Sequence, residues 1–541
     1  NNGELVNGDT TSPEALFANP GPDGISLPEA MRAALSVSGP HAIIFDPTLK
    51  ESTIELTSWL PNLDSSLIAI DGDIDTDGKP DITIDGAGST SSVGFRVLAS
   101  DITIKGLAIL NFTSVGIQVF ADSAQGWPLI ERVTIQGNRI IAGWAGISVY
   151  NWGQNCIIRD IDINHNELID NGARGIEISA ALGSSMHDNQ ITSVKITANA
   201  ISNTSGDNKI AIFMKGASDQ ASTNNLISEI DIVDNIITGH TFGNLLISAG
   251  NERNCLDNRI EHLLIEGNMI EGSPVTMEFL GGVGIGALRN WISDLRIVEN
   301  NLIGGGIQLV GAQGGDADQN RIEIVHIGQN SISGAAANGI FIIAGSDGAA
   351  HNTITGTTIE NNIISDKTDA GILLHGSGNT TPNNLIENVV ILNNTIVGNG
   401  HDWAGGININ SNSSTNIITG VKIINTILWN NAGDDVVRGS LTPEVVSCSI
   451  LNDPRFISTN GNFYSFPGFA DLNQKDFHIQ KNSPCIDKGD SQTATLPEYD
   501  FEGDGRILDG DKDGLAVVDI GADEYSVQQA MPWLLPLLLY Y

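Results

Sequence analysis

The chain has 541 residues, enough to bury a large hydrophobic core, and only 5% of them are aromatic. Its 64 acidic and 26 basic side chains give a formal net charge of −38. Nucleic acids and anionic membrane surfaces repel a polyanion, so we expect neither as a partner. The same charge favours cations, calcium above all. The sequence contains no run of 18 apolar residues, which predicts no membrane span.

Residues 1–40 are predicted to form an N-terminal segment with a short capping helix. Residues 26–29, Ser-Leu-Pro-Glu, form a capping box with proline in the first turn, a combination that begins helices. Met31, Ala34 and Leu35 then share one face. A helix over the open end of a β-structure covers backbone groups that otherwise pair with another chain.

An acidic loop follows the first short predicted strands. Aspartates at its positions 1, 3, 5 and 9 and glycine at position 6 match most of a calcium-binding loop. Position 12 is isoleucine, so we expect a neighbouring aspartate to supply the last ligand. The candidate ligands are Asp73, Asp75, Asp77, Asp81 and Asp85. The alternative is a solvated Asp-Gly turn that holds no ion.

The region from residue 41 to residue 436 carries an internal repeat of about 32 residues. Repetition with a fixed period of this size is typical of a solenoid, in which each repeat stacks on the next. The repeats begin with Asn-x-Ile at Asn155, Asn189, Asn225, Asn258, Asn290, Asn320, Asn352, Asn384 and Asn416.

Each repeat contains three short apolar pieces. The first is Asn-x-Ile, the second surrounds another asparagine about ten residues later, and the third is Gly-Ile-x-apolar. Apolar residues at i and i+2, many of them β-branched, predict strands with one buried face. Three strands per repeat predict an all-β fold, a parallel β-helix of roughly 10–13 coils. We expect like asparagines to stack in hydrogen-bonded ladders, which is a structural role.

The segment between the third piece and the next Asn-x-Ile is polar and variable. Such segments predict loops along one edge of the solenoid, where repeat proteins often bind ligands. Four tryptophans in or beside these loops either stack on sugar rings or cover coil corners. They are Trp127, Trp144, Trp152 and Trp403. Arg174 and Glu177 are predicted to form an ordinary ion pair.

The period is lost after residue 436, and residues 437–527 are predicted to form a C-terminal cap rich in Gly, Asp and Pro. A second acidic loop in this region is another candidate calcium site, against the same alternative of a solvated turn. Its candidate ligands are Asp509, Asp511, Asp513 and Asp519. Cys448 and Cys485 are candidates for a disulfide bond.

Residues 528–541 form an apolar tail with two prolines. Such a short segment neither spans a bilayer nor forms a stable helix. We expect it to bury itself against its own chain or against a neighbouring copy. The candidate assembly residues are Met531, Trp533, Leu534, Leu535, Leu537, Leu538, Leu539, Tyr540 and Tyr541.

Two segments resemble bacterial secreted or surface β-helix proteins. Residues 25–31, Ile-Ser-Leu-Pro-Glu-Ala-Met, are similar to their Ser-Leu-Arg-Glu-Ala-Ile segment, with Pro28 and Met31 as departures. Residues 482–490 and 518–525 resemble the choice-of-anchor Q C-terminal region. The resemblance implies a right-handed parallel β-helix and an extracellular or cell-surface location, and it implies no activity.

The leading prediction is a non-enzymatic, extracellular structural rod with structural calcium. We expect it to self-associate into a filament or surface layer through its ends and apolar tail. The sequence brings no catalytic cluster together, because His375 and Asp434 lie two repeats apart. The alternative is a carbohydrate-active enzyme, either a polysaccharide lyase or a glycoside hydrolase, or a glycan-binding adhesin that uses the loop edge.

Overall fold

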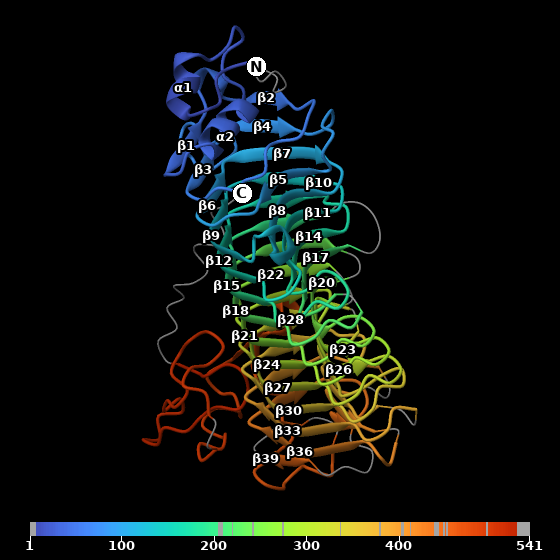
Figure 1. Cartoon of the computed structure of the whole chain (residues 1–541). Coiled ribbons are helices and arrows are strands. Elements are labelled where there is room, and N and C mark those ends of the chain that lie inside the picture. The colour runs from blue at the N-terminus through green and yellow to red at the C-terminus, as the bar shows by residue number, and fades with distance from the viewer. Residues whose placement is uncertain are drawn as a thin grey trace.

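The chain forms an elongated parallel β-solenoid with a small irregular region at its C-terminal end (Figure 1). The computed structural model describes residues 7–526 with internal gaps. The gaps are residues 204–208, 219, 241–242, 273–274, 336, 378–379, 402–404, 412, 438–442, 447–448, 451–452 and 494–495.

The N-terminal end of the solenoid is covered by two helices, α1 (Pro13–Ala18) and α2 (Leu27–Leu35). The Ser26 hydroxyl accepts a bond from the Glu29 amide at 3.4 Å, and the Glu29 carboxylate accepts one from the Ser26 amide at 2.8 Å. Met31 is fully buried and belongs to the same hydrophobic core as the coils. The capping helix predicted from the sequence is therefore confirmed.

Within the described residues three sheets run along the axis, and each complete coil adds one strand to each of them. Sheet A has 14 strands: β1 (His41–Ile44), β3 (Ile68–Asp71), β6 (Ile102–Lys105), β9 (Leu129–Gln136), β12 (Ile157–Asn164), β15 (Gln190–Thr197), β18 (Leu226–Val233), β21 (Arg259–Glu266), β24 (Trp291–Val298), β27 (Arg321–Gly328), β30 (Thr353–Glu360), β33 (Leu385–Leu392), β36 (Ile417–Ile424) and β39 (Glu444–Val446).

Sheet B also has 14 strands: β2 (Ser52–Glu55), β4 (Ile82–Asp85), β7 (Leu107–Phe112), β10 (Arg139–Ala142), β13 (Glu167–Ile169), β16 (Ala200–Ser202), β19 (Ile236–His240), β22 (Met269–Gly272), β25 (Asn301–Ile303), β28 (Ser331–Ser333), β31 (Ile363–Ser365), β34 (Thr395–Val397), β37 (Ile427–Trp429) and β40 (Ser449–Ile450).

Sheet C has 12 strands: β5 (Val93–Val97), β8 (Val115–Asp122), β11 (Ala145–Trp152), β14 (Arg174–Ser179), β17 (Ile210–Lys215), β20 (Gly243–Gly250), β23 (Met277–Val283), β26 (Ile307–Gln313), β29 (Ile340–Ile343), β32 (Ile372–His375), β35 (Ile407–Asn410) and β38 (Val436–Val437). This number lies within the predicted range of 10–13 coils, and the predicted parallel β-helical architecture is confirmed. Short 3₁₀ turns lie at Pro47–Leu49, Ser123–Gln125 and Leu472–Gln474.

The core is a set of aliphatic columns that run parallel to the axis. In one coil Ile354, Ile364 and Ile372 point inward from β30, β31 and β32 and are fully buried. Parallel pairing places Ile354 beside Ile322 of the preceding coil and Ile386 of the next. Because every coil repeats this arrangement, the alternation of apolar and polar residues in the sequence becomes one continuous core.

One asparagine ladder occupies the corner between sheets A and B. Asn300 is typical: its Oδ1 accepts bonds from the backbone N–H and Nδ2 of Asn268, at 3.0 and 2.9 Å. Its Nδ2 donates to the carbonyl oxygen of Ile265 at 2.9 Å and to Oδ1 of Asn330 at 3.0 Å. The ladder asparagines are at most 1% exposed. They are Asn138, Asn166, Asn199, Asn235, Asn268, Asn300, Asn330, Asn362 and Asn394.

A second ladder lies between sheets C and A and contains the asparagines of the Asn-x-Ile signature. Its members are Asn189, Asn225, Asn258, Asn290, Asn320, Asn352, Asn384 and Asn416. Asn155 is not part of it, because Cys156 stands at that position and donates its N–H to Oδ1 of Asn189 at 2.9 Å. Asn155 instead forms the preceding left-handed corner, with φ of 54°. The signature is therefore one residue out of register in this coil.

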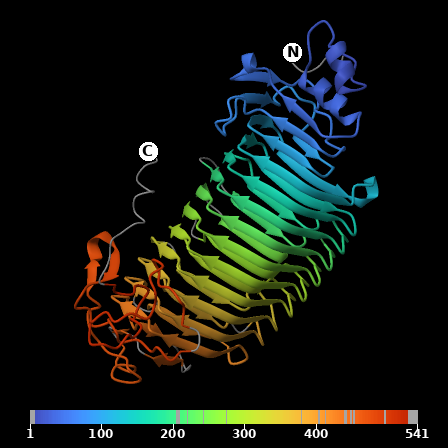
Figure 2. The same ribbon diagram turned by 90° about the vertical axis from the view of Figure 1, so that its left-hand side faces the viewer.

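The C-terminal region covers the last coils at the end opposite the helices (Figure 2). Phe456 packs against the end of the main hydrophobic core, and Nδ2 of Asn462 donates to the carbonyl oxygen of Val445 at 2.9 Å. An antiparallel pair of strands, β41 (Phe469–Asp471) and β42 (Asp476–Ile479), follows. Both ends of the solenoid are thus covered by segments of the same chain.

The ladder yields a prediction about stability. Replacing Asn300 by alanine leaves the buried backbone N–H of Asn268 without its acceptor and removes one acceptor of the Asn268 Nδ2, and an unsatisfied buried group costs roughly 1–3 kcal/mol. We expect Asn300→Ala to lower the melting temperature clearly. The matched control is Asn301→Ala, because Asn301 is the next residue and is exposed. Equal melting temperatures for the two variants would contradict the role given to the ladder.

His240, at the end of β19, predicts a pH dependence. Its side chain is 3% exposed, and Nδ1 has no hydrogen-bond partner within the described residues. Burial lowers the pKa of His240 to about 4, whereas an unfolded histidine titrates near pH 6.5. Between these values the unfolded state binds more protons, so stability falls as the pH is lowered.

We therefore expect the wild type to lose up to about 3 kcal/mol of stability between pH 6.5 and pH 4 because of His240. The His240→Gln variant should not show this loss. The measurement is melting temperature against pH for wild type and variant. His351→Gln is the control, because the side chain of His351 is 53% exposed. Parallel curves for wild type and His240→Gln would show that His240 does not set this dependence.

Candidate functional site

The first acidic loop lies between β3 and β4 and gathers three of its five aspartates. One carboxylate oxygen from each of Asp73, Asp75 and Asp81 lies within 4.8 Å of the others. Asp77 donates its backbone N–H to Oδ1 of Asp73 at 3.1 Å, and Asp85 accepts a bond from an asparagine side chain of β7. The structure therefore brings together three predicted ligands and places the other two in turn-forming contacts.

Lys50 supplies a cation to this loop. Its ammonium group contacts the Asp75 carboxylate and lies 3.5 Å from Oδ1 of Asp81. The hydrogen bond between Lys50 and Asp75 raises the pKa of Lys50 and lowers that of Asp75. A calcium ion on these carboxylates therefore competes with the ammonium group. The loop's own spacing gave no sign of Lys50, which lies 25 residues before Asp75.

An open hollow of about 520 Å³ lies beside the loop, along the corner between sheets A and B. A side chain at Gly106 would place Cβ 2.4 Å from the backbone nitrogen of Asp73, so glycine allows the loop to lie this close. The hollow is lined by Asp73, Asp77, Gly78, Lys79, Lys105, Gly106, Gln136, Gly137, His165, Asn166, Glu167, Ala198 and Ala200. Its mixed charges favour no single ligand chemistry.

The second acidic loop forms a different group from the one expected. Asp509 and Asp511 share a site with Asp487, again with one oxygen from each within 4.8 Å of the others. Asp513 donates its backbone N–H to Oδ1 of Asp509 at 3.1 Å. Asp519 is buried, and its Oδ1 accepts a hydrogen bond from the backbone N–H of Asp487 at 2.6 Å. Sequence spacing missed Asp487, because it comes from a separate turn of the C-terminal region.

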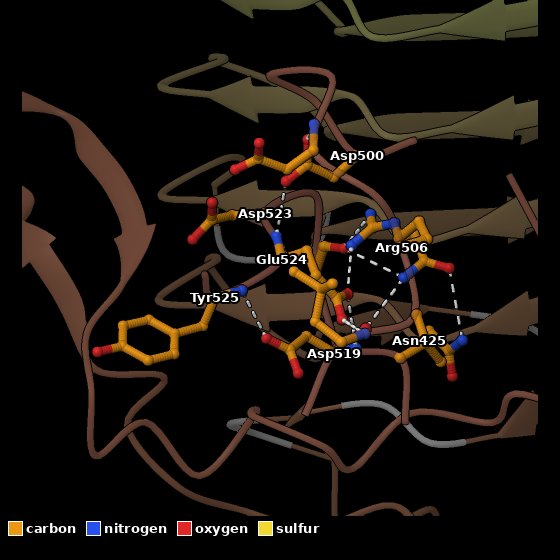
Figure 3. A network of polar contacts seen from close by, with 12 residues as sticks. Asn425, Asp500, Arg506, Asp519, Asp523, Glu524 and Tyr525 are labelled. Atoms are coloured by element: carbon orange, nitrogen blue, oxygen red, sulfur yellow. Dashed lines mark hydrogen bonds and ion pairs between the residues drawn. The ribbon is translucent and has the colours of Figure 1, made fainter. Parts of the chain in front are cut away.

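A buried polar network joins the C-terminal region to the solenoid (Figure 3). Arg506 is 1% exposed, and its guanidinium group donates to Oδ1 of Asn361 at 2.5 Å and to the carbonyl oxygen of Gly521 at 2.7 Å. It also lies 3.4 Å from the Glu524 carboxylate. Asn361 belongs to the corner between sheets A and B, so Arg506 connects two parts of the chain 145 residues apart.

This network holds more buried acids than bases. Asp500, Asp519, Asp523 and Glu524 are all at most 5% exposed, and Arg506 lies among them. Burial raises the pKa of Asp500 to about 6, of Asp519 to about 7 and of Asp523 to about 8. These carboxyls are in the protein interior, so their shifted pKa values reflect packing around the docked segment and not an open cleft.

Exposed tryptophans lie at the two edges of sheet C, one where its strands begin and one where they end. Trp144, just before β11, is 49% exposed, and Trp152, at the end of β11, is 45% exposed. Trp127 is partly buried, and its backbone pairs with that of Asp122. Trp403 lies outside the described residues. The sequence analysis missed Trp59, which precedes the regular repeat and is 55% exposed.

Trp59 lines a pocket of about 270 Å³ at the edge where the strands of sheet C begin. The lining residues are Trp59, Leu60, Asn62, Thr90, Ser91, Val93, Gly94 and Arg96. Backbone bonds from Ser114 to Ser92 and from Trp144 to Ser114 place Trp144 two coils beyond Ser92. At the usual spacing between strands this is about 10 Å along the axis.

Charged residues lie on β14 and β17, the strands of sheet C that follow β11. Glu177 pairs with Lys215 at 2.9 Å, and both side chains are buried. Arg174 instead stacks over the ring of Phe213 at 4.6 Å and lies 5.8 Å from the ring of Trp144. The expected pairing of Arg174 with Glu177 is therefore replaced, because β17 brings Lys215 directly beside the neighbouring strand.

Besides Trp403, two predicted features fall on residues that the structure does not describe. Cys448 is one of them, so the disulfide with the buried Cys485 stays a prediction. The apolar tail, residues 528–541, is the other. Among the described residues, no helix has the length and apolar character needed to cross a membrane.

Comparisons with known proteins give no family. No family model matches the chain, and no curated protein matches it. Among solved structures, pectate lyase Pel9A is 14% identical over 83% of this chain and 89% of its own, with a TM-score of 0.32. The A-module of the Azotobacter vinelandii mannuronan C-5 epimerase AlgE6 is 12% identical over 76% of this chain and 95% of its own, with a TM-score of 0.37. These values are too low to transfer an activity.

The two acidic loops predict a response to calcium. An ion that binds only the folded chain adds about 2.7 kcal/mol of stability at 100 times its dissociation constant. We expect a higher melting temperature in calcium than in chelator, and a smaller difference for Asp75→Asn. Lys50→Met removes the competing ammonium group and should tighten calcium binding.

The control for these loop variants is Asp64→Asn, since Asp64 is exposed and lies outside both acidic groups. Identical melting curves in calcium and in chelator would remove both loops as calcium sites.

Proposed function

We propose that this protein is an extracellular, glycan-binding β-solenoid whose binding surface is the edge where the strands of sheet C begin. One observation supports the proposal more than any other: Trp59 and Trp144 are both about half exposed and lie along this edge. An aromatic ring buries the apolar face of a sugar without ordering a flexible side chain. Trp59 lies one coil before Ser92 and Trp144 two coils beyond it, so the two tryptophans are about 14 Å apart along the axis, a distance that a short oligosaccharide spans.

The pocket beside Trp59 has the chemistry that a sugar needs. Asn62, Thr90 and Ser91 offer neutral hydrogen-bonding groups, and Arg96 adds a cationic donor. Ligand sites commonly combine a mainly apolar surface with a few convergent polar groups of this kind. Arg174, stacked near Trp144, extends the polar character along the edge and favours sugars that carry a carboxylate or sulfate.

Self-association has less support than glycan binding. Addition of a strand from a second copy needs an open sheet edge at one end of the solenoid. Met31 of the capping helix covers one end, and Phe456 packs over the other. The apolar tail remains the predicted assembly element, and it lies outside the described residues. A filament therefore stays a prediction from residues 531–541.

The experiment is a glycan array followed by affinity measurement on the best ligand. Trp59→Ala and Trp144→Ala should each weaken binding about 3- to 10-fold, the effect of losing roughly 0.5–1.5 kcal/mol of aromatic contact. Trp152→Ala is the matched control, because Trp152 is equally exposed at the opposite edge of the same sheet.

Two results would count against this function. Failure to bind any neutral or acidic polysaccharide would refute it, and equal weakening by Trp152→Ala would place the site elsewhere. Cleavage of a bound polysaccharide would show instead that the alternative, a carbohydrate-active enzyme, is correct.

A further inference from the structure

Three segments of the C-terminal region bring His478, Glu502 and Asp523 to one point. His478 lies on β42, Glu502 in the turn closed by the bridge between Tyr499 and Gly505, and Asp523 in the buried segment 518–524. One ligand atom from each of the three side chains lies within 4.8 Å of the others. Nε2 of His478 is 3.0 Å from Oε1 of Glu502.

The imidazole ring of His478 is held in a fixed orientation by a second carboxylate. Its Nδ1 contacts the carboxylate of Asp476, two residues earlier on the same strand. Because Nδ1 donates to Asp476, Nε2 meets the Glu502 carboxylate as a second donor, and a metal ion would bind there in exchange for the Nε2 proton. Histidines that bind metal ions almost always have this arrangement, which fixes the tautomer and increases the basicity of the ligand.

The site is surrounded by buried carboxylates, which a bound cation would stabilise. Asp523 is 5% exposed, and its Oδ2 accepts one bond, from the backbone N–H of Ile479 at 2.7 Å. Asp500 lies near it and Glu524 is the next residue, both buried, and Arg506, the buried base in the described part of this network, contacts Glu524. Buried carboxylates are normally paired or bound to a metal, because an isolated buried charge is costly.

We propose that His478, Glu502 and Asp523 bind one divalent transition-metal ion of the zinc class. One imidazole and two carboxylates suit zinc better than calcium, which prefers oxygen ligands in larger number. His478 and Glu502 are 40% and 30% exposed, so an ion can enter from solvent and keep a water ligand.

The ion would be structural. It connects β42 to the turn at residues 499–505 and to the segment at residues 518–525, which docks on the solenoid through Arg506 and Asn361. The site differs from the two acidic loops in its nitrogen ligand. The inference also does not depend on glycan binding, since it concerns the opposite end of the chain from Trp59.

The test uses the full chain, stripped of metals with a chelator and dialysed. Titration with zinc chloride, followed by calorimetry and by metal analysis, should give about one tightly bound ion per chain. His478→Ala and Glu502→Gln should each weaken this binding at least tenfold. Cobalt(II) should bind in place of zinc and give a visible absorption spectrum that is lost in His478→Ala.

The matched control is His262→Ala, because His262 is an exposed histidine that pairs with a single carboxylate, Asp294. It should bind zinc as the wild type does. Should His478→Ala fail to fold, Glu502→Gln provides the same test with a smaller change of shape. The absence of a tight zinc ion in the wild type would overturn the proposal. Unchanged zinc binding in the His478 and Glu502 variants would do so as well, and would leave an ordinary ion pair between His478 and Glu502.

Discussion

The rest of the structure depends on the asparagine ladders at the corners of the coils. Where the backbone turns sharply, its polar groups lose the partners that a strand would provide, and burial makes unpaired groups costly. Each ladder asparagine supplies both a donor and an acceptor to the neighbouring coils, as Asn300 does for Ile265 and Asn268. This fixes the register of one coil on the next, and the register places the inward isoleucines in columns.

The same corner serves a second purpose on its outer side. Asn361 and Asn393 directly precede ladder asparagines, have positive φ values of 53° and 51°, and bond to the C-terminal region instead of the core. Earlier coils have Gly137 and His165 at the equivalent positions, and there the corner borders the open hollow. The same corner is thus covered by the C-terminal region in the later coils and open in the earlier ones, while the ladder beneath it stays the same.

The repeat allowed the architecture to be predicted from the sequence, because a period of about 32 residues reports local geometry that every coil shares. The sequence did not reveal features that depend on contacts between distant segments. Lys50 reaches the first acidic loop from another coil, Lys215 takes the place of Arg174 as partner of Glu177, and Asp487 joins the second loop. The register shift at Cys156 was missed for a different reason: an asparagine stands one position too early and imitates the signature.

Hydrogen–deuterium exchange of the full chain tests the central claim most directly. Ladder amides belong to the corners, which in most proteins exchange quickly, yet here they are buried and bonded to the next coil. The account predicts that peptides containing Asn235, Asn268, Asn300 and Asn330 exchange as slowly as the centres of the sheet A strands. Exchange at these corners as fast as in the loops beyond sheet C would show that the ladders do not hold the coils together.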